Sequence, residues 1–179
     1  MRAGRIATLI VTIVGLLAAP LAVTAPASAA PCAAVSVVWA RGTVETAPPV
    51  GVTGLTFEQE LRGRLPGKSV RMSAVNYPAS GNFENRHAFV RNVVRGIKDT
   101  QRQVRTIAAR CPRTKIVVGG YSQGAVVATY AVADRIEIPE RYLRYRDQAP
   151  NPMPDSVARH VSSVILIAPA SKRWIRQVG

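Results

Sequence analysis

Short continuous apolar runs alternate along this chain with longer segments in which apolar residues recur at helical spacing. Four runs predict buried strands: VSVVWA from Val35, SVRMSAVNYP from Ser69, KIVVGG from Lys115 and HVSSVILIAPA from His160. Helical periodicity predicts three helices between them, one ending near Leu65, one over residues 85–110 and one over 124–136. Strands that alternate with helices predict an α/β fold with a parallel sheet covered on both faces, because parallel neighbours need crossover connections.

Capping and breaking residues predict the helix boundaries. Thr56, with Gln59 three residues later, forms a capping-box pattern that predicts the start of the first helix, and Pro66-Gly67 predicts its end. The helix predicted over 124–136 is apolar nearly all round, which indicates burial against the sheet. The proline-rich segment 141–156 is predicted to be a surface loop.

The N-terminus has the pattern of a secretory leader. Arg2 and Arg5 precede an apolar run over residues 6–23, and Ala27-Ser28-Ala29 forms a small-residue cleavage site. We therefore expect a signal peptide over residues 1–29, export of the protein, and one domain over 30–179 that is incomplete at its C-terminus. A membrane anchor is the alternative, and Pro20 together with the cleavage site argues against it.

The chain is strongly basic, with 24 Lys and Arg against 10 Asp and Glu and a formal net charge of +14. Such a balance favours anionic partners. Along residues 86–110, however, the cations alternate with apolar residues at helical spacing, which predicts the solvent face of a helix. No reading motif or aromatic platform accompanies the charge, so we expect no nucleic-acid partner, whereas peripheral contact with an anionic cell envelope stays open.

Cys32 and Cys111 are the only two cysteines. In a chain headed for an oxidising compartment, one disulfide between them is the natural expectation. Two free thiols, or a metal site built from two cysteines alone, are the alternatives. A lipid anchor on Cys32 is disfavoured by Pro31 directly before it.

A glycine-flanked serine follows the strand predicted from Lys115. The five residues Gly120-Tyr121-Ser122-Gln123-Gly124 have the form GxSxG, between an apolar strand and an apolar helix. In that context the motif holds a serine hydroxyl above the sheet on a strained turn, and the helix N-terminus directs amides at the reacting oxygen. We predict that Ser122 is a nucleophile and that the Gln123 backbone N–H is an oxyanion donor. A glycine-rich turn with an incidental serine is the alternative.

Three segments together resemble secreted cutinases, most closely the actinobacterial cutinase-like esterases: CPRTKIVVGGYSQGAVV, VVWARGTVE and LPGKSVRMSAVNYPAS. The resemblance runs from Cys32 to about Ile167. It implies a small, lidless α/β-hydrolase that acts on ester or lipid substrates with Ser122 as nucleophile. It also implies that Gln123 and Thr43 form the oxyanion hole and that Cys32 pairs with Cys111. A plain turn role for Thr43 is the alternative. The sequence contains no ligand cluster with workable spacing, so we expect no cofactor and no metal, and we expect a monomer.

The chain departs from the family where the catalytic aspartate and histidine are expected. After Ala170 the sequence contains no Asp, Glu, His or Cys. Asp155 and His160 follow Ser122 in the order that such hydrolases use. However, His160 is predicted at the amino end of its strand, roughly 20 Å from a serine at the carboxyl end of a parallel neighbour. His87, with Glu84 nearby, is on the correct side of the sheet but matches no family position.

Three functions follow from these observations, and the one with the least support is a redeployed hydrolase that uses His87. The first is a secreted carboxylic ester hydrolase, impaired because the family's Asp and His are absent, with an exposed sheet edge where the last strand and helix are lacking. The alternative is a non-catalytic exported protein that keeps the hydrolase scaffold and binds anionic envelope lipids or polymers through its positive charge.

Overall fold

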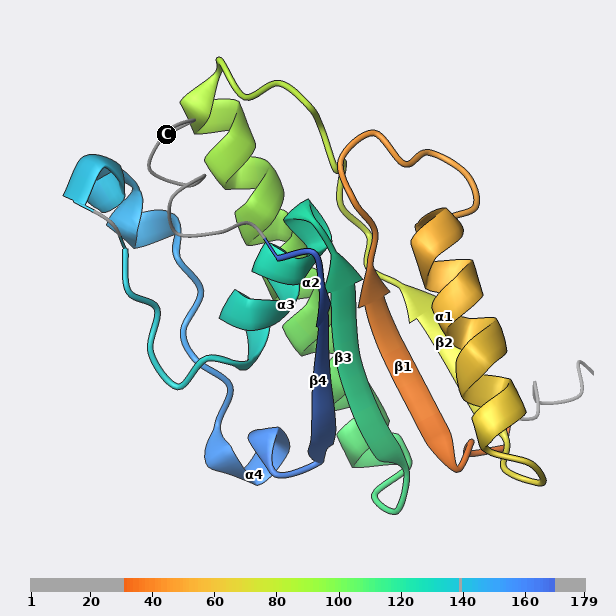
Figure 1. The fold of residues 1–179 in the computed structure, drawn as a ribbon. Coiled ribbons are helices and arrows are strands. Elements are labelled where there is room, and N and C mark those ends of the chain that lie inside the picture. Colours follow the sequence, from red (N-terminus) through yellow and green to blue (C-terminus); the bar gives the residue numbers. More distant parts are fainter. Residues whose placement is uncertain (1–30, 139, 170–179) are drawn as a thin grey trace, which may run out of the picture. The chain divides into compact units, whose positions relative to one another are not determined.

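The computed structural model describes residues 31–138 and 140–169, and the predicted leader lies outside them. Four parallel strands form one sheet in the order β2-β1-β3-β4 (Figure 1). The strands are β1 (Val35–Ala40), β2 (Val70–Ala74), β3 (Lys115–Tyr121) and β4 (Val161–Ile167). The predicted α/β class and all four predicted strands are therefore confirmed.

Helices cover both faces of this sheet, as the alternation of elements predicts. Figure 1 shows α1 (Gly51–Arg64) on one side and α2 (Arg86–Arg110) and α3 (Gln123–Val132) on the other. Successive residues of β1 alternate between two hydrophobic cores because side chains of a strand point to opposite faces. Trp39 packs on the α1 side, where its ring stacks on Phe57 at 4.9 Å, and Val38 packs on the α2 side.

Helix α2 agrees closely with its prediction. The side chain of Asn85 caps it by accepting from the N–H of Ala88 at 3.0 Å, and the helix ends at Arg110. Its apolar residues face the core, while its predicted solvent face is exposed, comprising Arg91, Arg95, Lys98, Arg102 and Arg105. At its end Cys111 forms the expected disulfide with Cys32, which excludes the free-thiol and metal alternatives.

The predicted start of α1 is wrong. The helix begins at Gly51, before the capping box, and Thr56 lies inside it with its hydroxyl donating to the Val52 carbonyl. Contacts of the preceding turn fix this start. Gly51 has a φ of 73° and donates its N–H to Pro48, and a side chain at this position would collide with the Glu45 carboxylate. A local capping pattern contains none of this tertiary information.

The segment after α3 also differs from its prediction. Helix α3 ends at Val132, where Ala133 turns to an extended conformation, so residues 133–136 are not helical. The proline-rich stretch predicted as a loop contains a 3-10 helix, η1 (Glu140–Gln148), and a short helix α4 (Asp155–Ala158). In η1 the ring of Tyr145 packs 5.5 Å from the ring of His87 at the start of α2.

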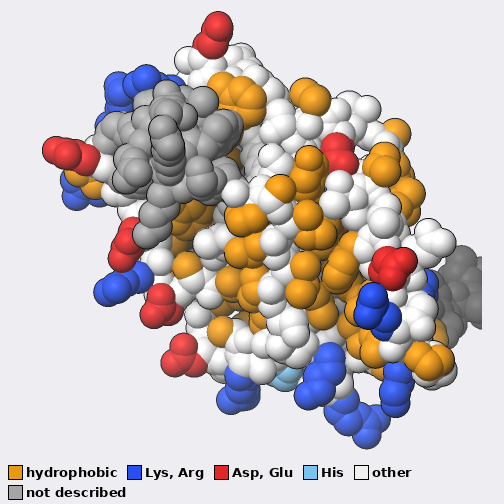
Figure 2. All heavy atoms as spheres, viewed as in Figure 1, with side chains coloured by type: hydrophobic (Ala, Val, Ile, Leu, Met, Phe, Trp, Pro, Cys, Tyr) orange, Lys and Arg blue, Asp and Glu red, His pale blue; other side chains and the backbone are white. Residues whose placement is uncertain are grey.

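Strand β4 forms one edge of the sheet in the described part of the chain. Its Val164 and Leu166 are 40% and 39% exposed, as expected for an edge without a covering strand. Figure 2 shows hydrophobic side chains at the surface across the middle of the view, where Figure 1 has β3 and β4. None of the described helices is both long enough and apolar enough to cross a membrane.

Candidate active site

The carboxyl ends of β1 and β3 form the point where the chain connections diverge. The connection after β1 runs through α1 to β2, and the connection after β3 runs through α3 to β4 on the opposite face. In open α/β sheets such a divergence leaves a crevice where ligands bind. Ser122 follows β3 and Thr43 follows β1, so both predicted residues lie at this one edge.

Ser122 occupies a strained turn between β3 and α3. Its φ is 51° and its ψ is −114°, a backbone conformation that L-residues rarely adopt. Two sets of hydrogen bonds hold the turn. The Ser122 N–H donates to the Ile167 carbonyl of β4 at 3.0 Å, and the Ser122 carbonyl accepts from the N–H of Ala125 at 3.0 Å. Strain that is held in this way by its surroundings is typical of functional sites.

The two glycines of the motif are required by close backbone approach. A Cβ on Gly120 would lie 2.9 Å from the Ala125 nitrogen and closer still to the Gly124 carbonyl. A Cβ on Gly124 would lie 2.6 Å from the Arg41 carbonyl oxygen and closer still to that of Ala40. The start of α3 therefore rests directly on the end of β1, and a larger residue would separate them.

Contacts between the two turns place Thr43 beside the serine turn. A Cβ on Gly42 would meet the Tyr121 ring at 2.6 Å, so the residues preceding Thr43 and Ser122 are in contact. Gly42 donates its N–H to the Glu45 carboxylate, and Val44 donates its N–H to the Ala79 carbonyl at 2.8 Å. The N–H of Thr43 itself has no acceptor among the described residues.

The N-terminus of α3 supplies the second amide. Gln123 is the first helical residue, so its N–H has no partner within the helix. Its side chain is buried, and Nε2 donates to the Ser80 carbonyl at 3.3 Å while Oε1 has no partner. This bond connects α3 to the loop after β2. Two backbone N–H groups without acceptors, from Thr43 and Gln123, thus border the serine turn.

Arg41 and Tyr77, which the sequence analysis did not identify, fasten the loops after β1 and β2 to each other. The Arg41 guanidinium donates to the carbonyls of Tyr77 at 2.8 Å and Pro78 at 3.1 Å. In return, the Tyr77 hydroxyl donates to the Arg41 carbonyl. Burial raises the pKa of Tyr77 well above its ordinary value, although the Arg41 charge acts in the opposite direction. The hydroxyl therefore stays protonated and remains a donor at neutral pH.

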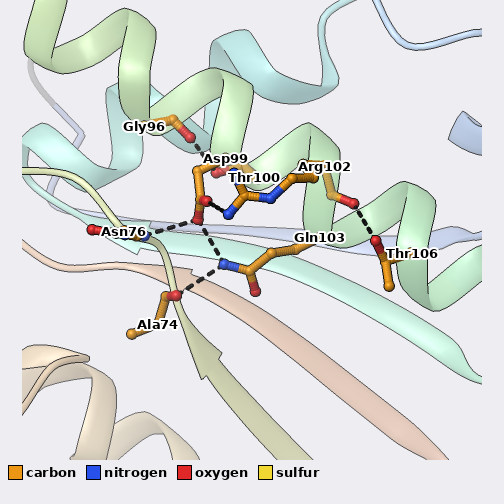
Figure 3. Close-up of polar contacts among 8 residues, drawn as sticks. All are labelled: Ala74, Asn76, Gly96, Asp99, Thr100, Arg102, Gln103 and Thr106. Carbon is orange, nitrogen blue, oxygen red and sulfur yellow. Dashed lines mark hydrogen bonds and ion pairs between the residues drawn. The ribbon is translucent and has the colours of Figure 1, made fainter.

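Asp99 anchors the same loop from the side of α2 (Figure 3). Its buried carboxylate accepts from the Asn76 backbone N–H at 2.8 Å and from the Gln103 amide at 2.7 Å, and it pairs with Arg102. Gln103 also donates to the Ala74 carbonyl at the end of β2. A buried carboxylate is stable only with such partners, and here they fix where the chain leaves β2.

Neither histidine is positioned as a base for Ser122. In the β3–β4 pairing Ile116 is opposite Val161 and Tyr121 is opposite Ile167. His160, directly before Val161, therefore lies at the amino edge, roughly 20 Å from the serine edge at about 3.3 Å per residue, as the sequence analysis expected. Asp155, in α4 just before His160, precedes that same edge.

His87 lies near the carboxyl edge, at the start of α2, but its ring is already engaged. Its Nδ1 lies 2.6 Å from Nη1 of Arg91. Because a guanidinium only donates, Nδ1 is the acceptor and the neutral ring has its proton on Nε2. In this state neither ring nitrogen is open to accept a proton from a serine. No group of three or more His, Cys, Asp or Glu within reach of one metal ion occurs among the described residues.

Comparison with known proteins identifies the family of this chain. The family model described as Cutinase matches residues 31–177. The chain belongs to the cutinase family. Among other cutinase-family proteins, it is 33% identical over 166 residues to carboxylesterase Culp1 of Mycobacterium tuberculosis, across 93% of this chain and 64% of that protein. It is 36% identical over 138 residues to a cutinase of Kineococcus radiotolerans, across 77% of this chain and 41% of that protein.

A solved acetylxylan esterase has the same fold. It superposes with a TM-score of 0.61 at 27% identity, covering 78% of this chain and 65% of that one. The small α/β-hydrolase fold that the resemblance to cutinases implied is therefore confirmed. The chain spans less than two thirds of the length of these relatives, so their activities are carried over to it only as a proposal.

Proposed function

We propose that this cutinase-family chain is a serine hydrolase of carboxylic esters. The observation that carries the proposal is the Ser122 turn: its φ of 51° and ψ of −114°, between β3 and α3, match a nucleophile elbow. The names of the relatives support the same chemistry, since carboxylesterases, cutinases and acetylxylan esterases all cleave esters of carboxylic acids.

In the proposed reaction the Ser122 hydroxyl attacks the ester carbonyl carbon and gives its proton to water. The carbonyl oxygen becomes an oxyanion, which accepts hydrogen bonds from the N–H groups of Thr43 and Gln123. The leaving oxygen takes a proton from water and departs as the alcohol. A second water then hydrolyses the acyl-serine, which releases the carboxylic acid and restores the Ser122 hydroxyl. Preorganised donors of this kind typically contribute about 10²–10³ in turnover for each donor.

The chain as printed should perform this reaction slowly. Its two histidines, His87 and His160, are not positioned to take the proton from Ser122. Loss of the base costs a serine hydrolase about 10⁶ in turnover, whereas the oxyanion hole and binding alone retain about 10³–10⁴ over water. We therefore expect weak hydrolysis, of which one part passes through Ser122 and the rest comes from the oxyanion hole and binding without the serine.

The test compares Ser122→Ala with Ser163→Ala, a control at an exposed serine of β4. Release of nitrophenol from a short-chain nitrophenyl ester should be slower in Ser122→Ala than in the wild-type chain, although above the buffer rate, and should stay unchanged in Ser163→Ala. A fluorophosphonate probe, followed by mass spectrometry, should label Ser122 in the wild-type chain. Nitrophenol release that is equally fast in Ser122→Ala and in the wild-type chain, or labelling at another residue in place of Ser122, would refute the proposal.

We further propose that the protein is exported. The leader pattern over residues 1–29 supports export, and the Cys32–Cys111 disulfide fits an oxidising compartment. Secretion would place the serine where extracellular esters can reach it. Detection of a mature form in the culture medium that begins near Ala30 would test this directly.

A second candidate function is attachment to an anionic envelope. It is favoured by a groove of about 580 Å³ beside α2, where four cations (Arg91, Arg95, Lys98 and Arg102) outnumber the two acidic residues Asp99 and Asp147. Exposed cations attract anionic polymers, and this attraction is screened by salt. Sedimentation with anionic vesicles that is lost at high salt and unchanged in Ser122→Ala would support it. Equal sedimentation with neutral vesicles would refute it.

A further inference from the structure

Positively charged side chains form a single row along the exposed face of α2. Five of them follow one another at alternating intervals of four and three residues: Arg91, Arg95, Lys98, Arg102 and Arg105. Three or four residues make about one turn of an α-helix, so these side chains share one face and lie about 5 Å apart along the helix axis. The row is therefore a line of charges with a regular repeat.

Little within the chain neutralises this row. Asp99 is the only acidic residue of α2, and its buried carboxylate pairs with one of the five cations, Arg102. The other four cations form no ion pair within the described part of the chain. Like charges at these intervals destabilise a helix. An anionic ligand from outside the chain would remove this repulsion.

The row borders a groove of about 580 Å³, which all of the five cations except Arg105 line. Asn76, from the loop after β2, and Gln148, at the end of η1, line it as well. One oxygen of Asp99 pairs with Arg102 and the other accepts from the Asn76 N–H, so the row and the loop are fixed to each other (Figure 3). The groove therefore combines cations for an anion with side-chain amides for hydroxyl groups.

We propose that this groove binds a linear anionic polymer whose repeating unit carries one negative charge and hydroxyl groups. The inference rests on the second candidate function, attachment to an anionic envelope, and names the partner of that site. Charges that line a cleft concentrate their field within it. An extended chain can enter such a groove, whereas the flat surface of a membrane cannot. No aromatic side chain of the described residues lines the groove, so the bases of a nucleic acid would find no stacking partner there.

Fluorescein-labelled oligogalacturonates, which carry one carboxylate on each sugar, serve as the probe. Their binding to the full chain is followed by fluorescence anisotropy at low salt. Affinity should rise with oligomer length until the oligomer covers the distance from Arg91 to Arg102, about 16 Å, and should then level off. It should fall as salt is added, because exposed charges are screened. An affinity that does not rise with length, or that salt leaves unchanged, overturns the inference.

The double variant Arg95→Gln with Lys98→Gln removes two charges from the middle of the row. It should weaken binding about tenfold, the combined effect of losing two exposed ion pairs of ordinary strength. The matched control, Arg64→Gln with Lys68→Gln, removes one exposed arginine and one exposed lysine at the end of α1, on the other face of the sheet. It should weaken binding by less than about twofold. Equal losses in the two double variants would mean that net charge alone attracts the polymer, and would overturn the inference.

A third variant should change the affinity in the opposite direction. Asp147 lines the same groove, and its carboxylate is exposed. Asp147→Asn removes a negative charge that repels the polymer, so it should strengthen binding about threefold. Damage to the fold would not produce a gain. Binding that is unchanged or weaker in Asp147→Asn counts against the groove as the binding site.

Anionic vesicles separate this inference from the function on which it rests. If the chain sediments with anionic vesicles but does not bind oligogalacturonate, attachment to an anionic envelope stands and the polymer groove is refuted. If the chain binds neither, both proposals fail. A single-stranded oligonucleotide of equal charge that binds more tightly than oligogalacturonate would also overturn the inference, because the groove would then be a nucleic-acid site.

Discussion

Replacing Gly124 by alanine should loosen the serine turn, and the structure sets the size of the effect. The new Cβ would lie 2.5 Å from the Ala40 carbonyl carbon, whereas ordinary contact begins at 3.4 Å, so β1 or α3 must retreat by about 0.9 Å. Overpacking typically costs 1–3 kcal/mol, and the upper end applies because the opposing atoms are backbone. Alanine recovers about 1 kcal/mol of helix propensity. The net loss is about 2 kcal/mol.

Thermal unfolding followed by circular dichroism measures this loss. A domain of this size loses about 2–4 °C in Tm for each kcal/mol, so Gly124→Ala should melt about 4–8 °C below the wild type. Its Ser122 should also react more slowly with a fluorophosphonate, because the amides of α3 move with the helix. The matched control is Gly63→Ala in α1, where a Cβ has nothing within 4 Å.

Gly63→Ala should raise Tm by about 2–4 °C, since alanine is favoured over glycine in a helix by about 1 kcal/mol and meets no obstacle. The two alanine variants should therefore shift Tm in opposite directions. A Gly124→Ala variant that melts at or above the wild-type temperature would refute the argument that α3 rests directly on the end of β1.

Two further predictions concern the groups that support the site. Tyr77→Phe should cost about 1 kcal/mol at pH 7, the loss of one buried hydrogen bond. Folding raises the pKa of Tyr77, so the unfolded tyrosine ionises first and the free energy of unfolding of the wild type should fall as pH rises above about 10. Urea unfolding at pH 7 and at pH 11 measures this fall, which should be smaller in Tyr77→Phe. The pKa of Tyr130 is also raised by burial, so part of the loss of stability at high pH should remain in Tyr77→Phe. An equal loss in the wild type and in Tyr77→Phe would show that Tyr77 does not cause it. Asp99→Ala should lower the free energy of urea unfolding by about 2–3 kcal/mol, because the Asn76 N–H loses its buried acceptor. The control Asp147→Ala, at an exposed position, should lower it by under about 0.5 kcal/mol. Similar losses in the two variants would show that the buried carboxylate adds no stability.

The sequence predicted the features that depend on residues close together in the chain. Asn85 caps α2 because its side chain reaches an amide three residues away, and the alternation of valines and arginines along α2 follows from helical geometry. The alternation of apolar runs with helical segments also predicted the four strands and the parallel sheet. The serine turn was predictable because its two glycines and its flanking strand and helix are contiguous in the chain.

Features that depend on contacts between distant segments were missed. The start of α1 is set by Glu45 against Gly51, which no capping rule includes. Arg41 and Tyr77 bind each other's backbones across 36 positions, and Asp99 contacts Asn76 across 23. No local signal marked Asp99, because the burial of this residue in α2 depends on segments that are distant in the chain. Identifying its partners requires the tertiary structure.

The abutment of Gly124 on the end of β1 limits where a proton acceptor for Ser122 can lie. With its turn held by β1, β4 and α3 together, Ser122 has no freedom to swing toward a distant imidazole. The proton acceptor must be brought to the serine, on a segment that reaches the rim formed by the carboxyl ends of β3 and β4. An added histidine elsewhere would be idle, however basic it is, whereas even free imidazole in solution that reaches this rim should accelerate the reaction of Ser122.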